Sequence, residues 1–91
     1  MKNEWQIGVN KLPYYKSNVC EILFSIHDYI YSGEICWEVW VSFKSKKFPR
    51  LVGEPEAITE ENLVRKFLIE FPTPQDFFDV AKSTFNWDLQ Y

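Results

Sequence analysis

Two runs of alternating apolar and polar residues predict one long β-hairpin over Val19–Ser45. Apolar side chains occupy every second position of Cys20–Ile30, with Asp28 as the exception, and again of Ile35–Phe43. Because side chains on a strand point alternately to opposite faces, each arm has one apolar face. Ser32-Gly33 lies between the arms, and glycine can adopt the positive φ that tight hairpin turns require.

A two-residue turn at Ser32-Gly33 predicts the register of this hairpin. Ile30 then faces Ile35 on the apolar face, and Asp28 faces Trp37. A one-residue slip would move every apolar side chain to the wrong face, so the pattern and the turn support the same register. We expect the tip to extend beyond the core, because Asp28 lies close to it. The polar face then carries these cross-strand pairs: Glu21 with Lys44, Leu23 with Ser42, Ser25 with Trp40, His27 with Glu38, and Tyr29 with Cys36.

The segments on either side of the hairpin are predicted to be short strands and loops. The alternation of Trp5, Ile7 and Val9 predicts a first strand over residues 4–10. Residues 11–18 contain a proline and two tyrosines and are expected to form a loop, whose tyrosines pack on the sheet or touch a partner. The basic stretch 44–50 favours a solvated loop with lysines guarding a sheet edge over a contact with phosphate or an acidic partner. Residues 48–52 could add a fourth strand at an edge.

Two helices are predicted in the C-terminal part of the chain. Thr59 is a good N-cap, Glu60 and Glu61 suit the first turn, and apolar residues then recur at helical spacing as far as Phe71. Pro72 ends this helix. The stretch Thr73–Asp76 begins the second helix with a cap, a proline and an acid.

This order of elements predicts an α+β fold. We expect one domain over residues 1–91, with a three- to four-stranded antiparallel sheet built on the central long hairpin and two C-terminal helices packed on one face. The apolar face of the hairpin meets the helices, and the face with His27, Glu38 and Trp40 looks outward.

The charge pattern narrows the classes of partner. The chain has a formal net charge of −3, which argues against a direct nucleic-acid binder. The acids concentrate in the C-terminal half, so a basic protein partner is the natural inference. The chain shows neither a signal peptide nor a run of about 18 apolar residues that could span a membrane, so we expect no membrane contact.

The two cysteines, Cys20 and Cys36, lie on opposite faces of the predicted hairpin and cannot bridge within it. Reduced thiols are typical of a cytoplasmic protein. The chain carries no zinc-binding pattern, glycine-rich phosphate loop or calcium-binding loop, so we expect no metal and no cofactor.

Two kinds of site can be placed on the outward face. His27, Glu38 and Cys36 are a base, an orienting carboxylate and a nucleophile in principle, but a cross-strand His–Glu pair is common on surfaces, so catalytic residues are not assigned. Trp40, Tyr29 and Tyr31 form an aromatic patch, with Leu23 beside them, of the kind that anchors protein partners, unless other segments cover it.

The helical half supplies a second candidate surface. Asp76 and Asp79 belong to an acidic face that either is simply solvated or attracts a basic protein. Together with His27, Glu38 and the aromatic patch, they are the predicted binding residues.

These features favour a small acidic inhibitor that binds a protein. The first hypothesis is a bacterial immunity protein or antitoxin that neutralises a basic, nuclease-type toxin and is not itself an enzyme. A phage counter-defence inhibitor resembling anti-CRISPR proteins is the alternative, and a small thiol-dependent enzyme using Cys36 is the third.

Overall fold

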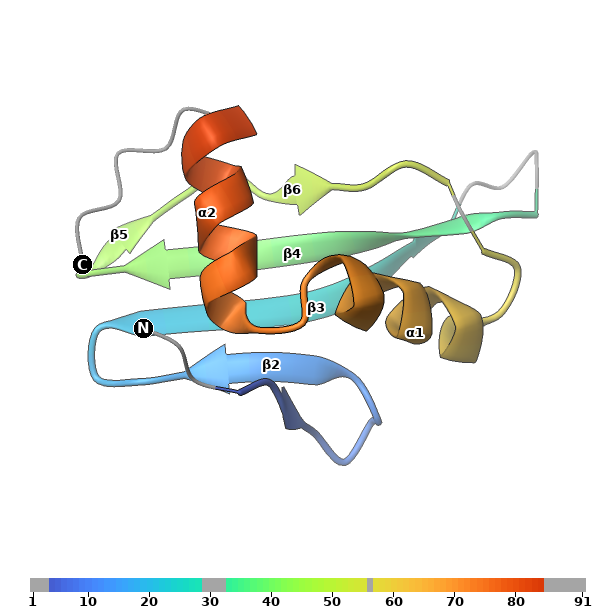
Figure 1. Ribbon diagram of the computed structural model, residues 1–91, viewed down its shortest axis with the longest axis horizontal. Coiled ribbons are helices and arrows are strands. Elements are labelled where there is room, and N and C mark those ends of the chain that lie inside the picture. The colour runs from blue at the N-terminus through green and yellow to red at the C-terminus, as the bar shows by residue number, and fades with distance from the viewer. Residues whose placement is uncertain (1–3, 29–32, 56, 85–91) are drawn as a thin grey trace.

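The structure is a computed structural model that describes residues 4–28, 33–55 and 57–84, and it shows an antiparallel sheet with two helices over one face (Figure 1). The sheet order is β1-β2-β3-β4-β5, and β6 also pairs with β4. The strands are β1 (Gln6–Ile7), β2 (Pro13–Lys16), β3 (Cys20–Asp28), β4 (Ile35–Phe43), β5 (Lys46–Lys47) and β6 (Leu51–Val52), and the helices are α1 (Glu60–Glu70) and α2 (Pro74–Thr84).

The α+β architecture is confirmed, but the sheet has six strands rather than the three to four predicted. Strand β2 lies within residues 11–18, which we expected to be a loop, and Pro13 is its first residue. Proline is tolerated at the start of a strand, so it does not exclude one here. The first strand is also shorter than the predicted 4–10, because Val9 turns into solvent and the chain reverses at Lys11, whose φ is 64°.

The hairpin of β3 and β4 is confirmed, but its predicted register is wrong by two residues. Phe24 faces Val39, Ile26 faces Trp37 and Asp28 faces Ile35. A shift of two keeps every side chain on the same face, so alternation alone cannot distinguish the two registers. Asp28 is exposed at the end of the strand, in agreement with the expectation that this end of the hairpin extends beyond the core. Gly33 has the predicted positive φ, at 72°.

Both helices begin at the predicted caps. The side chain of Thr59 accepts a hydrogen bond from the backbone N–H of Asn62 at 3.3 Å. At the start of α2, the Thr73 hydroxyl accepts from the N–H of Asp76, whose carboxylate in turn accepts from the N–H of Thr73 at 2.9 Å. This reciprocal pair is a capping box, which satisfies N–H groups that a helix start leaves unpaired.

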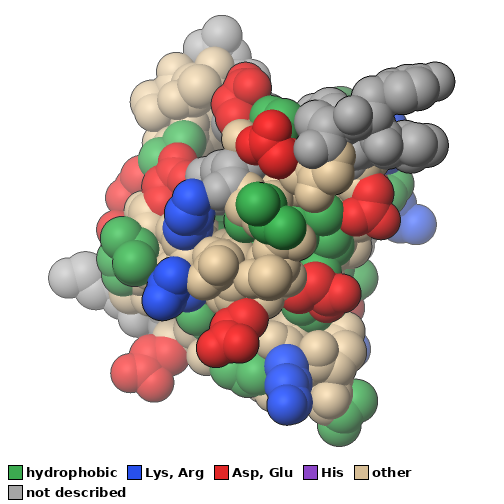
Figure 2. Space-filling view, turned by 90° about the vertical axis from the view of Figure 1, so that its right-hand side faces the viewer, with side chains coloured by type: hydrophobic (Ala, Val, Ile, Leu, Met, Phe, Trp, Pro, Cys, Tyr) green, Lys and Arg blue, Asp and Glu red, His purple; other side chains and the backbone are tan. Residues whose placement is uncertain are grey.

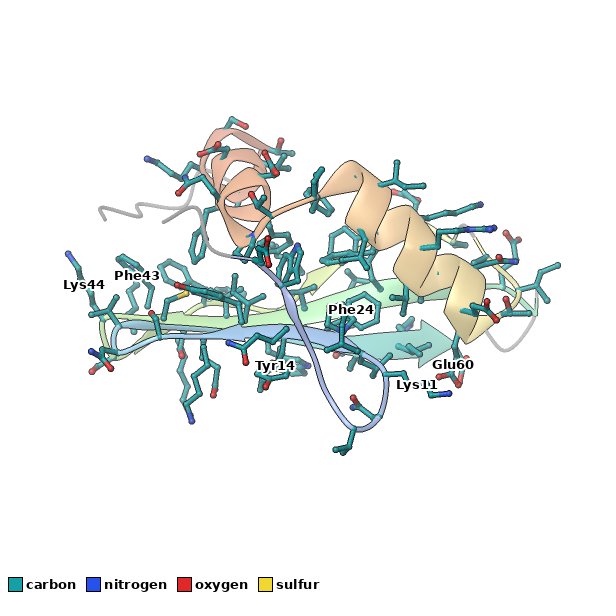
Figure 3. The ribbon with its side chains drawn as sticks, turned by 60° about the horizontal axis from the view of Figure 1, so that its bottom comes forward. Lys11, Tyr14, Phe24, Phe43, Lys44 and Glu60 are labelled. Carbon is teal, nitrogen blue, oxygen red and sulfur yellow. The ribbon has the colours of Figure 1, made fainter. Side chains whose placement is uncertain are left out.

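An aromatic core fills the space between the sheet and the helices. Phe67 of α1 lies at its centre, with its ring centroid 4.9 Å from that of Phe24 and 5.7 Å from that of Trp37. Trp5, in the N-terminal segment, packs 5.5 Å from Phe67 and donates a hydrogen bond from Nε1 to the carbonyl of Phe71 at 2.7 Å. In Figure 3, Phe24 and Phe43 lie on the helix side of the sheet and Tyr14 on the other side. The helices therefore cover one face of the sheet and leave the other face without a helix over it.

Candidate outer-face binding site

The face of the sheet turned away from the helices, hereafter the outer face, is organised in cross-strand rows. One row joins three large side chains, because Tyr14 of β2 pairs with Leu23 of β3 and Leu23 pairs with Trp40 of β4. Leu23 is 44% exposed and Trp40 is 48% exposed. An aromatic side chain half exposed beside a leucine is typical of a protein-binding hot spot.

The corrected register produces this row. In the predicted register Trp40 faced Ser25, and Leu23 faced Ser42, so the two large side chains lay on different rows. In the structure Ser25 faces Glu38 and Ser42 faces Glu21, which brings Leu23 and Trp40 together. The sequence analysis identified Trp40 as a binding residue but did not place Leu23 directly across from it.

A groove of about 400 Å³ lies on this face beside Trp40. Its side chains come from both hairpin strands and from the segment that follows them: Glu21, Leu23, Trp40, Ser42, Lys47 and Phe48. Lys47 faces Ser42 across β4 and β5 and is one of the residues that line the groove. Lys46 pairs with Phe43, and its Nζ lies 5.0 Å from the centroid of the ring of Phe48, which also lines the groove.

Phe48 and Lys47 are members of the site that the sequence analysis did not assign. Residues 44–50 were interpreted as a solvated loop because four of the chain's lysines and arginines gather there. The available signal was Phe48, an aromatic residue inside a basic stretch. Trp40, which lines the same groove, lies on a different strand, so the sequence pattern alone could not bring the two residues together.

Glu38 is the one charged side chain that is buried among the described residues, with 7% of its surface exposed. Its Oε1 accepts a hydrogen bond from Nη1 of Arg50 at 3.1 Å, and its Oε2 lies 3.4 Å from Nδ1 of His27. A carboxylate removed from water is costly unless it is paired, and here two partners compensate it. The group thus ties β3, β4 and the segment before β6 together.

The predicted trio of His27, Glu38 and Cys36 is brought together, with a changed arrangement. His27 faces Cys36 directly and reaches Glu38 on the diagonal, the reverse of the predicted pairing. The side chain of Cys36 is fully buried, at 0% exposure, and the outer-face groove lies beside Trp40 instead. A thiol nucleophile needs access to its substrate, and this position does not provide it.

The other cysteine is also shielded. Neither Cys20 nor Cys36 forms a disulfide. Burial raises the pKa of the Cys20 thiol to about 12, and the negative charge of Glu21 adds to the effect. The thiol of Cys20 is therefore protonated near neutral pH.

Two of the predicted binding residues, Asp76 and Asp79, lie away from this site. Tyr29 and Tyr31 lie outside the described residues. Asp76 and Asp79 lie on α2, on the helix side of the sheet. Asp76 belongs to the capping box described above, and Asp79 accepts a hydrogen bond from Nε2 of Gln75 at 3.0 Å. The acids of α2 and Trp40 are thus separated by the thickness of the sheet.

Charge is polarised along the sheet. The end that carries the β4–β5 turn has several lysines: Lys16, Lys44, Lys46 and Lys47. The opposite end, where β3 ends and α1 begins, has acids instead: Asp28, Glu34, Glu54, Glu60 and Glu61. Figure 2 looks onto this second end and shows acidic side chains over it with Lys and Arg side chains among them, while Figure 3 places Lys44 at one end and Glu60, beside Lys11, at the other. A partner on the outer face therefore meets potentials of opposite sign at its two ends.

Comparison of the chain with protein-family models, with curated proteins and with solved structures found no match. Within the described ranges, no group of three or more His, Cys, Asp or Glu side chains could hold a metal ion. Neither helix is long and apolar enough to cross a bilayer, as far as the described residues extend.

Proposed function

We propose that this protein is a small inhibitor that binds another protein through the outer face of its sheet, with Trp40 as the central anchor. The observation that carries the proposal is the row of Leu23 and Trp40, which lie side by side and half exposed on a face that the helices leave uncovered. A partner that covered this row would gain roughly 25 cal/mol for each Å² of apolar surface removed from water.

The biological role that we propose is that of a bacterial immunity protein or antitoxin acting in the cytoplasm. The proposed partner is a basic toxin of the nuclease type. Support comes from the acidic end of the sheet, which would attract such a protein and orient it before contact. The acids of α2 support this role less directly than the sequence suggested, because they lie behind the sheet.

Two other roles remain as weaker proposals. A phage counter-defence inhibitor would use the same outer face, and the neighbouring genes would separate it from an immunity protein. A thiol-dependent enzyme is less well supported, because Cys36 is buried and Glu38 already binds Arg50 and His27.

Affinity capture from the native host, with the protein as bait, tests the binding proposal. The variant Trp40→Ala removes the proposed anchor, and Ile69→Ala is the matched control because Ile69 is 73% exposed on α1. We expect the wild type and Ile69→Ala to retain the same partner. Trp40→Ala should bind it at least about 30-fold more weakly, the effect of losing 2 kcal/mol at a hot spot.

The captured partner then decides the biological role. Co-expression with the wild type should relieve the growth inhibition that the partner causes, and Trp40→Ala should relieve it less. Equal retention of the partner by Trp40→Ala and the wild type would overturn the assignment of the outer face. A partner without toxicity would overturn the immunity role while leaving the binding site in place.

A further inference from the structure

We infer that the groove beside Trp40 receives an acidic segment of the partner protein, in which one large apolar side chain is flanked by Asp or Glu. The inference rests on the proposed function and concerns the same face. It specifies which chemistry the partner presents at the lysine end of that face.

The apolar part of the ligand follows from what the groove presents. Leu23, Trp40 and Phe48 contribute hydrocarbon surface from three different segments, and the volume of about 400 Å³ is enough for one large side chain and its neighbours. The hairpin ladder already fixes the backbone of Leu23 and Trp40 on adjacent strands. Little ordering entropy is then lost on binding, which favours a well-defined anchor.

The acidic part follows from the ionic partners of the rim. The two acids of the outer face beside the groove are already engaged, because Glu21 lies 4.0 Å from Lys16 and Glu38 accepts from Arg50. Lys47 instead lines the groove across from Ser42, and Nζ of Lys46 lies near the ring of Phe48. Their positive charge is thus not balanced by these two acids, and a carboxylate placed beside Phe48 would balance it.

A peptide fits these observations better than a single-stranded nucleic acid. Nucleic-acid sites on sheets combine a cationic track for the phosphates with several aromatic faces for stacking. Here the groove has Glu21 and aliphatic Leu23 on β3, on one side of β4, and Lys47 on β5, on the other side. A chain of closely spaced phosphates would have to pass Glu21, whereas a peptide can place its acids only where the lysines are.

The inference also reconciles the groove with a basic toxin. The partner would present its acidic segment to the lysine end and its basic surface to the end with Glu54 and Glu60. Two opposite charge contacts fix one orientation of the complex and oppose its reversal.

Selection from a phage-displayed library of random peptides tests the chemistry of the groove without the natural partner. We expect the wild type to enrich peptides with one aromatic residue or leucine flanked by acids. Trp40→Ala should not retain them. Selected peptides without acids, or peptides that bind Trp40→Ala equally well, would overturn the inference.

Charge reversal tests the lysines directly with a synthetic copy of a selected peptide. The double variant Lys46→Glu/Lys47→Glu should bind it at least about tenfold more weakly than the wild type at low salt, and added salt should reduce the difference. The double variant Lys66→Glu/Lys82→Glu makes the same change of net charge on exposed positions of the helices and should bind normally. Thermal unfolding followed by circular dichroism confirms that both variants fold.

A labelled single-stranded oligothymidylate is the third probe. Tighter binding of the oligonucleotide than of the peptides, lost in Lys46→Glu/Lys47→Glu, would assign the groove to nucleic acid and overturn the inference. The inference alone fails if the captured partner needs Trp40 but tolerates the lysine reversals. The proposed function alone fails if acidic peptides bind the groove while the captured partner tolerates Trp40→Ala.

Discussion

Two buried side chains of the sheet, Trp37 and Cys20, are shaped by their immediate surroundings. Trp37 packs so closely on Gly53 that a methyl group at Gly53 would overlap its indole ring, and the Gly53 N–H donates to the carbonyl of Trp37 at 2.8 Å. Glycine is needed at this position for close approach rather than for backbone freedom. At the other end of the sheet, Cys20 is 3% exposed on the core side and faces Phe43. The pKa of its thiol therefore depends on how well this part of the core excludes water.

The Cys20 thiol should make the stability of the protein depend on pH in the alkaline range. Its pKa is about 12 in the folded protein, against an ordinary value of 9.0. A raised pKa contributes stability that is complete below pH 9 and is lost as the pH rises toward 12, by up to about 1.4 kcal/mol per pH unit. Cys20→Val removes this contribution. Urea unfolding of both proteins between pH 8 and 11 should therefore show the wild type losing stability faster.

Comparison with Cys20→Val isolates the thiol, because every other ionisable group is present in both proteins. A constant difference in the free energy of unfolding from pH 8 to pH 11 would show that Cys20 is not shielded from water. The reactivity of the thiol provides a second check, since alkylation by iodoacetamide at pH 8 should be slow until the protein unfolds.

At the scale of elements, residue patterns predicted faces and caps better than they predicted pairing. The caps at Thr59 and Thr73 depend on side chains within one turn of the helix, so local sequence contains the whole signal. In the register of β3 and β4 that the structure shows, Phe24 and Trp37 both contact Phe67, a residue far along the chain. That information is tertiary, and the alternation of the strands does not contain it.

The residues of the outer-face site could be predicted only in part for the same reason. Trp40 was identified because aromatic side chains on an outward face are typical anchors for protein partners. Leu23 was placed on the same face but not across from Trp40, since that pairing depends on the register, and Phe48 was not assigned, since its position depends on the β4–β5 turn. That turn lies among two lysines and a serine, in a stretch whose composition suggests a solvated loop, so the sequence pattern did not predict it.

The β4–β5 turn carries backbone strain that a single substitution should relieve. Lys44 and Ser45 connect Phe43 to Lys46, and both have positive φ, at 50° and 66°. Tight hairpin turns require this conformation, but it costs a residue other than glycine about 1–2 kcal/mol. Ser45→Gly should therefore raise the free energy of unfolding by up to about 1 kcal/mol after the entropic cost of glycine. Urea denaturation measures the change.

Ser83→Gly is the control for this substitution, because Ser83 is exposed in the last turn of α2. Glycine in a helix should lower stability by about 0.5–1 kcal/mol, the opposite sign. A wild-type or lower stability of Ser45→Gly would show that the turn is not strained in solution.

The whole molecule is held together by contacts between segments that are distant in the chain. The N-terminal segment reaches the helices through Trp5, and β6 reaches the centre of the sheet through Leu51 opposite Val39. Such non-local contacts explain why the strand order could be predicted only in outline. They also place the proposed binding face on the far side of the core, so a change in the core and a change in the groove should be separable.

Trp5 links the N-terminal segment to the helices, so we expect it to contribute to the free energy of unfolding of the whole domain. Its indole N–H donates to the carbonyl of Phe71 at 2.7 Å, and its ring packs against Phe67 and Phe77. Trp5→Phe removes the hydrogen bond and should cost about 1 kcal/mol, whereas Trp5→Ala also empties part of the core and should cost about 3 kcal/mol. Ile7→Ala, at a side chain 55% exposed in β1, should change stability by less than about 0.5 kcal/mol.

Far-ultraviolet circular dichroism and tryptophan fluorescence should give the same midpoint for each variant if the domain unfolds as one unit. Equal stabilities of Trp5→Ala and Ile7→Ala would instead mean that the N-terminal segment only rests on the surface.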